Sequence, residues 1–229
     1  MLMPGMPAKQ RVIVYIDGFN LYFGIRADGL GRYLWLDLCA FSRGLLKEGQ
    51  VLVGVKYFTS RVSSPPEKRA RQAAYLDALG TLDPGLLSIT YGNYQEAPFT
   101  CFHCGRVSIS PSEKKTDVNI AVAMLSDAFR NTFDVALLVT GDSDLRAYSE
   151  RCLRPAVEAV HSISDQKRVV VCSPPSRVSK ELIAVAHGHY VIGRARLRDS
   201  QLPNPVDLRS GFQLRKPSLW DDPEYQKPH

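Results

Sequence analysis

The sequence predicts an α/β fold, a three-layer sandwich around a central, mainly parallel sheet of about five to six strands. Short apolar runs alternate with amphipathic helical patterns along most of the 229 residues, which is the order of a doubly wound sheet. The apolar runs are almost continuous, as is typical of strands that helices cover on both faces. A hydrophobic fraction of 45% and a mean hydropathy of −0.15 indicate a globular chain with a substantial core.

The expected strands follow from the β-branched apolar runs. They cover residues 11–16, 51–58, 86–94, 134–141 and 167–173, with a short edge strand at 190–193. The expected helices lie between them, at residues 35–47, 66–80, 117–129 and 177–187. Apolar spacing predicts their buried sides: Leu38, Phe41, Leu45 and Leu46 in the first, Ala73, Leu76 and Leu79 in the second, Val118, Val122, Leu125 and Phe129 in the third.

Two segments depart from this alternation. Residues 95–112 form an excursion, with the character of a hairpin, that holds a Cys-x-x-Cys pair. Beyond a domain at residues 10–193, residues 194–229 form a Pro-rich strap without helical periodicity. Four apolar side chains are candidates to pin this strap to the domain: Leu202, Phe212, Leu214 and Trp220. The alternative is a partly ordered tail.

Composition excludes several classes of protein. No apolar run approaches the roughly 20 residues that cross a bilayer, and the N-terminus lacks the apolar region of a signal peptide. Five cysteines, odd in number and unevenly spaced, favour reduced thiols and a cytoplasmic location over a disulfide framework. The net charge of +6 is compatible with a polyanionic partner such as nucleic acid.

The functional signal is the position of the acids. Asp17 follows the first expected strand, Asp142 and Asp144 follow the fourth, and Asp117 lies in the first turn of the helix before that fourth strand. Asn20 follows Asp17 by three residues. Sites in open α/β sheets form beyond the carboxyl ends of the strands, so these side chains are expected on one rim of the sheet.

A single acid after a strand is often only a helix N-cap, and Ser143 or Asp142 is a candidate cap for a helix starting at Leu145. Clustered carboxylates, however, repel one another unless a cation lies between them. Mg²⁺ takes carboxylates together with waters and phosphate oxygens, and such clusters serve phosphodiester hydrolysis.

Other α/β chemistries lack their motifs in this chain. There is no phosphate-binding Gly-x-x-x-x-Gly-Lys-Ser/Thr loop, and the turn after the first strand is not the Gly-rich turn of a dinucleotide site. Phe19 stands where an aspartyl-phosphate phosphatase needs its second acid, and no Gly-x-Ser-x-Gly elbow is present. A metal-dependent nuclease remains.

Three motifs carry a resemblance to a known family. Val14-Tyr-Ile-Asp-Gly-Phe-Asn-Leu-Tyr22, Glu113-Lys-Lys-Thr-Asp-Val-Asn119 and Val139-Thr-Gly-Asp-Ser-Asp-Leu145 are similar to the signatures of the NYN-domain family, within the PIN-like nuclease superfamily. The resemblance covers about residues 10–193. It is strongest to the bacterial LabA-like branch, which the tail motifs Ser200-Gln-Leu-Pro203 and Lys216-Pro-x-x-Trp220 also resemble.

The resemblance implies a PIN-like fold and a ribonuclease that uses Mg²⁺ or Mn²⁺ to cut single-stranded or structured RNA, leaving a 5′-phosphate. Asp17, Asp117, Asp142 and Asp144 would hold the metal, and Asn20 would assist near the scissile phosphate. The segment Arg146–Leu153 departs from the family pattern and puts the placement of Asp144 in doubt. The alternative is a catalytically weak RNA- or protein-binding module that retains the acidic pocket.

Secondary features add candidates of lower specificity. Cys101 and Cys104 are half of a structural Zn²⁺ site, to be completed by Cys39, His103 or a second subunit in a homodimer, or else a reduced thiol pair. Candidate phosphate contacts are Arg61, Lys68, Arg69, Arg71, Lys114, Lys115 and Arg146. Candidate base-stacking residues are Tyr22, Phe23, Tyr57 and Phe58, of which at least two are expected to be core residues instead.

Overall fold

A computed structural model of the chain describes residues 8–100, 107–114, 116–141 and 150–227. Its centre is a six-stranded sheet in the order β3-β2-β1-β6-β7-β8, in which every neighbouring pair is parallel. The strands are β1 (Gln10–Asp17), β2 (Gln50–Thr59), β3 (Leu87–Tyr91), β6 (Val135–Val139), β7 (Arg168–Ser173) and β8 (Gly188–Val191). The α/β class and the parallel sheet expected from the sequence are confirmed.

The strand order reverses at β1. From β1 the chain winds outward through β2 to β3, and it then returns to the other side of β1 and winds outward through β6, β7 and β8. The carboxyl ends of β1 and β6 therefore lie side by side, with Ile16 opposite Val139. In doubly wound sheets this reversal of strand order is where binding sites form.

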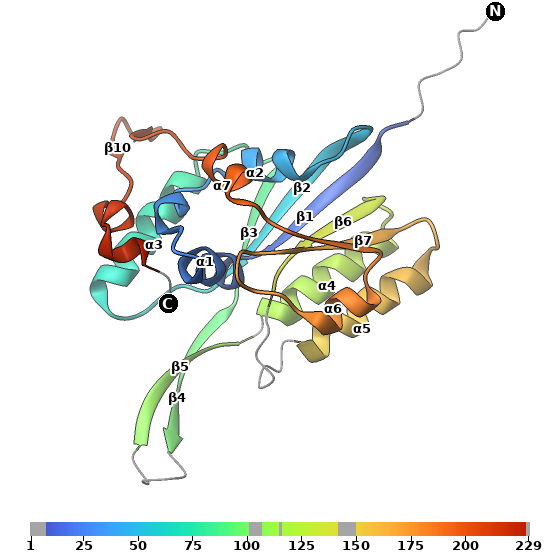
Figure 1. Cartoon of the computed structure of the whole chain (residues 1–229), viewed down its shortest axis with the longest axis horizontal. Coiled ribbons are helices and arrows are strands. Elements are labelled where there is room, and N and C mark those ends of the chain that lie inside the picture. The colour runs from blue at the N-terminus through green and yellow to red at the C-terminus, as the bar shows by residue number, and fades with distance from the viewer. Residues whose placement is uncertain (1–7, 101–106, 115, 142–149, 228–229) are drawn as a thin grey trace, which may run out of the picture.

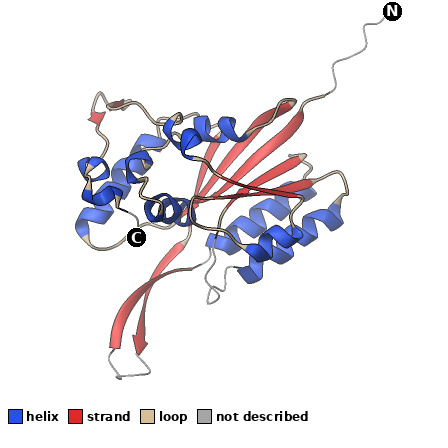
Figure 2. Cartoon of the chain, in the orientation of Figure 1, coloured by secondary structure: helices blue, strands red, loops and turns tan. Residues whose placement is uncertain are grey.

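Helices cover both faces of the sheet, as Figures 1 and 2 show. One face carries α1 (Gly18–Ala27), α2 (Leu38–Leu45), α3 (Pro66–Leu79) and α7 (Arg194–Arg198), and the other carries α4 (Thr116–Phe129), α5 (Glu150–Ile163) and α6 (Lys180–Val185). Side chains of β1 alternate between the two cores: Val14 and Ile16 pack under α1, whereas Ile13 and Tyr15 pack under α4 and α5.

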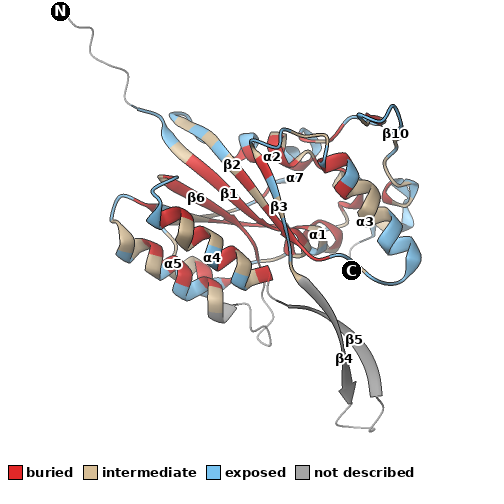
Figure 3. Ribbon diagram, turned by 180° about the vertical axis from the view of Figure 1, so that it is seen from behind, coloured by how far each residue is buried: buried red, intermediate tan, exposed pale blue. Residues whose placement is uncertain are grey.

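The buried side of α4 differs from the side predicted by apolar spacing. Ile120, Ala121, Met124 and Ala128 face the sheet, while Val118, Val122 and Phe129 are exposed by 45%, 61% and 75%. Figure 3 shows the same division along the helix. Small side chains such as Ala121 and Ala128 let α4 approach the strands closely, so the helix uses the stripe that fits the sheet and leaves the bulkier stripe outside.

The buried faces predicted for the two helices α2 and α3 are confirmed in part. Helix α2 buries Leu38, Phe41 and Leu45, while Leu46 is half-buried beyond its end. Helix α3 buries Leu76, Ala78 and Leu79, whereas Ala73 is half-buried.

Two strands leave the sheet as an antiparallel hairpin. β4 (Asn93–Thr100) and β5 (Val107–Lys114) pair along their whole length, from Asn93 opposite Lys114 to Thr100 opposite Val107. Figure 1 shows this hairpin projecting away from the sandwich. The excursion expected around residues 95–112 is thus a hairpin, and Cys101 and Cys104 lie outside the described residues.

The last part of the chain packs along the α1–α2–α3 face. Leu202 and Trp220 are buried, Leu214 is half-buried, and Phe212 is exposed by 74%, so Phe212 is not an anchor. The backbone of Leu202 donates a hydrogen bond to the carbonyl of Trp35. This region, residues 200–227, contains the short pair β9 (Val206–Asp207) and β10 (Gln213–Leu214). It is called the C-terminal segment below.

Short 3-10 helices complete the described part of the chain: η1 (Gly31–Tyr33), η2 (Ser218–Asp221) and η3 (Glu224–Gln226). None of the helices in the described ranges has the length and apolar character needed to cross a bilayer.

Candidate active site

Asp17 stands at the reversal point of the sheet. It is the last residue of β1, opposite Phe58 of β2, and α1 begins at the next residue without an intervening loop. Asp17 is only 2% exposed. The prediction that this carboxyl group lies at the carboxyl edge of the sheet agrees with its position in the structure.

The carboxylate of Asp17 is held in a fixed orientation by Asn20. The backbone N–H of Asn20 donates to Asp17 Oδ1 at 3.0 Å, and the side-chain amide of Asn20 donates to Asp17 Oδ2 at 2.7 Å. Asp17 is therefore the N-cap of α1. Each carboxylate oxygen can accept more than one bond, so the capping role by itself does not exclude a metal.

Close backbone packing shapes this edge of the sheet. A Cβ atom on Gly18 would lie 2.6 Å from the Tyr57 ring, and a Cβ atom on Gly141 would lie 2.5 Å from the carbonyl oxygen of Arg177. Neither position has room for a side chain. The glycine after Asp17 thus lets α1 sit directly on the end of β2, and Gly141 lets the end of β6 touch the turn that follows β7.

That turn brings in a cation that the sequence did not single out. The guanidinium of Arg177 donates to the side-chain oxygen of Asn20 at 3.4 Å and lies 5.6 Å from the centre of the Phe23 ring. Arg177 is half-buried. Its position after β7 follows the same carboxyl-edge rule that selected Asp17, and applying that rule to every strand would have found it.

Asp117 reaches the same edge from α4. The helix has 14 residues and is about 21 Å long, which exceeds the length of β6, about 17 Å for 5 residues. Helix α4 packs against β1 and β2 and leads through a short turn into β6. Because it must run antiparallel to β6, its first turn, with Asp117, lies at the carboxyl edge.

The remaining predicted acids, Asp142 and Asp144, lie outside the described residues, directly after Gly141. Within the described ranges, no three His, Cys, Asp or Glu side chains form a group that could hold a metal ion. The described donors at this edge, the carboxyl groups of Asp17 and Asp117, offer only oxygen, which is the donor type that Mg²⁺ and Mn²⁺ prefer. The donor set therefore fits a hard divalent cation. Joint coordination by the four acids stays a prediction.

One hydroxyl at the end of β6 is also notable. Thr140 is 1% exposed, and its side-chain oxygen has no hydrogen-bond partner among the described residues. A buried hydroxyl without a partner costs free energy. Thr140 immediately precedes Gly141, so its hydroxyl lies at the candidate site.

The other predicted contacts lie in different places. Lys68 and Arg71 line the cavity described next, and Arg69 is exposed outside it. The Arg61 guanidinium lies 4.6 Å from the Tyr91 ring centre at the edge of the sheet. The side chains of Lys114, Lys115 and Arg146, and the pair Cys101 and Cys104, lie outside what the structure describes. Cys39, one of the residues considered for completing a zinc site, is a core residue of α2, where burial raises the pKa of its thiol to about 11. Cys39 is therefore not suited to join a zinc site in the hairpin.

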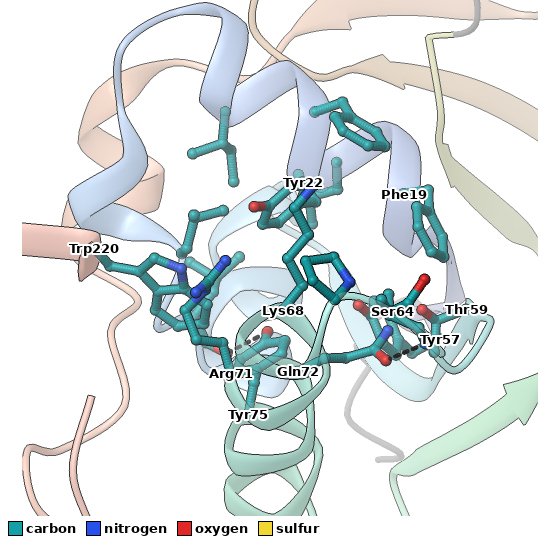
Figure 4. Close-up of a pocket in the computed structure, with 17 residues that line it drawn as sticks. Phe19, Tyr22, Tyr57, Thr59, Ser64, Lys68, Arg71, Gln72, Tyr75 and Trp220 are labelled. Atoms are coloured by element: carbon teal, nitrogen blue, oxygen red, sulfur yellow. Dashed lines mark hydrogen bonds between the residues drawn. The ribbon is translucent and has the colours of Figure 1, made fainter. Parts of the chain in front are cut away.

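A cavity of about 390 Å³ opens at the end of β2; Phe19, two residues after Asp17, is part of its lining, but Asp17 itself is not. Figure 4 shows that its walls come from α1, the end of β2, α3 and the C-terminal segment. Three of the four predicted stacking residues line it: Tyr22, Phe23 and Tyr57. The fourth, Phe58, is a core residue on the opposite face of the sheet.

Comparisons with known proteins agree with this architecture. The profile of the NYN domain matches residues 11–193. The chain is 27% identical to 6-hydroxy-3-succinoylpyridine 3-monooxygenase HspA of Pseudomonas putida (strain DSM 28022 / S16), with 92% of this chain and 75% of that protein covered.

A crystal structure of a protein of unknown function from Vibrio parahaemolyticus RIMD 2210633 is similar with a TM-score of 0.50 at 19% identity, covering 87% of this chain and 100% of that chain. At this level of identity the likeness shows the fold alone.

Proposed function

Because the chain belongs to the NYN domain family, a group within the nuclease superfamily, we propose that it is a Mg²⁺- or Mn²⁺-dependent ribonuclease. It would hydrolyse phosphodiester bonds of single-stranded or structured RNA at the carboxyl edge of the sheet. Within the family we assign it to the LabA-like branch, on the motifs of its C-terminal segment, and we propose a cytoplasmic location.

The observation that carries the proposal is the arrangement around Asp17. A buried carboxylate, fixed by Asn20, stands at the reversal point of a doubly wound sheet, and the guanidinium of Arg177 lies on the far side of the same Asn20. A carboxylate suits a divalent cation and a guanidinium suits a phosphate. Neighbouring groups of these two kinds support the proposal of phosphodiester cleavage.

Asp17, Asp117 and Asp142 would hold the metal, with Asp144 supporting them directly or through water. A metal bound there would supply an activated water and neutralise negative charge on the phosphate. The protein's own groups would orient the reactants: Asn20 fixes the direction in which the Asp17 carboxylate points, and Arg177 would contact a non-bridging phosphate oxygen. The Thr140 hydroxyl would donate to the substrate or to a water at the same edge.

The Pseudomonas relative raises a second candidate, oxidation of a substituted pyridine, because its name describes a monooxygenase of such a compound. One observation favours it: the cavity at the end of β2 has aromatic walls and the volume for a single ring system. The acids at the strand ends favour hydrolysis of a phosphodiester, since ring oxidation has no use for a rim of carboxylates. Hydrolysis therefore stands first.

The test is cleavage of a 5′-labelled single-stranded RNA in Mn²⁺ and in EDTA, with Asp17→Asn and Asp142→Asn beside the wild type. Loss of a charged group at the reacting centre should reduce cleavage by about 10²–10³-fold, while circular dichroism shows an intact fold because asparagine is also a good N-cap. The matched control is Asp165→Asn, an exposed acid after α5, which should cut like the wild type.

Cleavage that persists in EDTA or in both variants would refute the site. Absence of cleavage combined with RNA binding would favour the non-catalytic module. A parallel incubation with 6-hydroxy-3-succinoylpyridine, oxygen and a reduced nicotinamide, read by mass spectrometry, tests the second candidate.

A further inference from the structure

The cavity at the end of β2 has an apolar floor and aromatic walls. Buried residues of α1 and of the loop before α2 form the floor, among them Ile25, Leu34 and Leu36. Six aromatic side chains line it: Phe19, Tyr22, Phe23, Tyr57, Tyr75 and Trp220, five of which are labelled in Figure 4. Its volume of about 390 Å³ is at the small end of the range, about 300–1,000 Å³, of ligand sites. The cavity is therefore suited to one flat ring system rather than to a helix or a duplex.

One wall carries an unused hydrogen-bond donor. Trp220 is only 4% exposed. Its indole Nε1–H is buried and has no hydrogen-bond partner among the described residues. An indole N–H usually finds a partner when it is buried. An acceptor on the edge of a ligand ring would satisfy it.

The mouth of the cavity is cationic. Lys68 and Arg71 of α3 line it, and within the described residues neither forms an ion pair. Arg71 is close enough to the Tyr22 hydroxyl to pull down its pKa against a larger rise from burial. Among the described residues no acid pairs with these two cations, which indicates a ligand that carries a negative charge next to its ring.

The mouth is also fixed in shape. Gln72 accepts a hydrogen bond from the backbone N–H of Val62 at 2.7 Å and donates one to the carbonyl of Ser60 at 2.8 Å. These bonds hold the loop between β2 and α3, which supplies Val62, Ser64 and Pro65 to the cavity, against α3. This loop thus keeps its position against α3 without a ligand.

The cavity adjoins the candidate active site. Tyr57 packs on Gly18, the residue after Asp17, and Phe19 and Tyr22 of α1 line the cavity on the same side. A polymer whose phosphate lies at Asp17 can therefore place a neighbouring group here without leaving the surface.

From these contacts we infer that the cavity receives one unstacked nucleobase of the RNA substrate, with Lys68 and Arg71 contacting the phosphate of the same nucleotide. The inference rests on the proposed ribonuclease function. Bases stack on aromatic side chains whatever their sequence, the Trp220 N–H offers a donor to a ring nitrogen or carbonyl, and the cations complement the phosphate. The C-terminal segment is then part of the substrate site, since Trp220 belongs to it.

The test is binding of the four nucleoside 5′-monophosphates in EDTA, measured by isothermal titration calorimetry and by tryptophan fluorescence. At least one should bind, and its nucleoside without the phosphate should bind about tenfold more weakly or worse. The double variant Lys68→Ala/Arg71→Ala changes two side chains at the open mouth and should weaken nucleotide binding about tenfold or more. Arg130→Ala, an exposed residue directly after α4 and outside the cavity, is the matched control and should bind normally.

A second variant tests the ring contact separately. Phe19→Ala removes a half-buried lining ring and should weaken the nucleoside and the nucleotide equally, because it removes stacking and leaves the cations. In RNA cleavage, both the double variant Lys68→Ala/Arg71→Ala and Phe19→Ala should raise KM with little change in kcat. The reason is that they weaken binding away from the reacting phosphate.

The outcomes separate this inference from the proposed function. If the wild type cuts RNA but binds no mononucleotide, or if the double variant binds like the wild type, the inference is wrong and the ribonuclease stands. Asp17→Asn should keep mononucleotide binding while cleavage is lost, and binding without any cleavage by the wild type overturns the enzyme but not the cavity. Binding of nicotinate with rejection of all four nucleotides would overturn the inference in favour of a small heteroaromatic acid.

Discussion

The two edges of the central sheet use charge in opposite ways. At the amino edge, where β1, β6 and β7 begin, ionic side chains pair with one another and with backbone groups. At the carboxyl edge, where the same strands end, the Thr140 hydroxyl has no partner among the described residues, and the side chain of Arg177 forms no ion pair with any of them. The first edge stabilises the fold, and the second is available for a ligand.

The amino edge is closed by a small network. Arg11 forms a side-on pair with Asp134, with Nη2 to Oδ1 at 2.8 Å and Nε to Oδ2 at 3.2 Å, and its Nη1 donates to the carbonyl of Asn131 at 2.7 Å. Lys167, only 5% exposed, donates to the Asn131 side chain at 2.7 Å and to the carbonyl of Phe133 at 2.8 Å. These bonds tie the starts of three adjacent strands together, and they leave little capacity for a ligand.

Among the variants that test the difference between the two edges, we expect the largest effect at Arg177. Replacing Arg177 by Met should lower kcat for RNA cleavage by about 10–100-fold, or about 1.4–2.7 kcal/mol, because a charge-assisted contact to the phosphate is lost. Thermal unfolding should change little, since the side chain of Arg177 makes one long hydrogen bond and one ring contact within the described residues. The matched control is Arg11→Met at the other edge, which should reduce stability and leave kcat unchanged. If Arg177→Met lowered stability and Arg11→Met lowered kcat, the assignment of the carboxyl edge to the ligand and of the amino edge to stability would be wrong.

Lys167 tests the stabilising role of the amino edge. Lys167→Met keeps the length of the side chain and removes the ammonium, so the carbonyl of Phe133 and the Asn131 side chain each lose a donor. The free energy of unfolding should fall by about 1–3 kcal/mol, as measured by urea denaturation, with unchanged RNA cleavage below the transition. Lys47→Met, at an exposed turn, is the control. Equal stability of the two variants would show that the network contributes nothing.

The smallest effect is expected at Asp134. Arg11 holds the pKa of this carboxyl below its ordinary value, so the pair contributes stability above the pKa of the unfolded state, about 3.9. That contribution is lost as the pH falls through the lower pKa of the folded state. Asp134→Asn should cost less than about 1 kcal/mol at pH 7, because the pair is partly exposed. Urea midpoints at pH 7 and pH 3 should show the difference from wild type shrinking with acid, and a constant difference would contradict this reading.

Strand positions could be predicted because parallel strands are continuous apolar runs. The expected strands at 51–58 and 167–173 are within two residues of β2 (Gln50–Thr59) and β7 (Arg168–Ser173). Helix α1 was not predicted, because two glycines, Gly18 and Gly24, lower its helical propensity. Both are required by close contacts, with Tyr57 and with Pro174. Such contacts are tertiary and leave no periodic signal.

The sequence predicts the part of the site that follows from one rule, namely that sites form beyond the carboxyl ends of the strands. An acid directly after a strand could be recognised at Asp17, and the helix pattern placed Asp117. Arg177 was missed because an arginine in a Pro- and Ser-rich turn is common on protein surfaces. The cavity was missed because Trp220 reaches it from a segment far away in the sequence, where only packing against Trp35 and Tyr75 brings it in. Candidate stacking residues could be proposed from the sequence, but whether Tyr57 or Phe58 faces the cavity depends on the register of β2.

The strand order has a consequence for how the chain is made. β1 takes one neighbour, β2, early, but its other neighbour, β6, begins about 120 residues later, as the 123-residue separation of Arg11 and Asp134 shows. At about 5–20 residues per second, ribosomal synthesis leaves this edge of β1 unpaired for roughly 6–25 s. The exposed strand is the apolar run Val12–Ile16, a ready template for pairing with another chain. The strand that carries Asp17 is thus the one a nascent chain must protect longest.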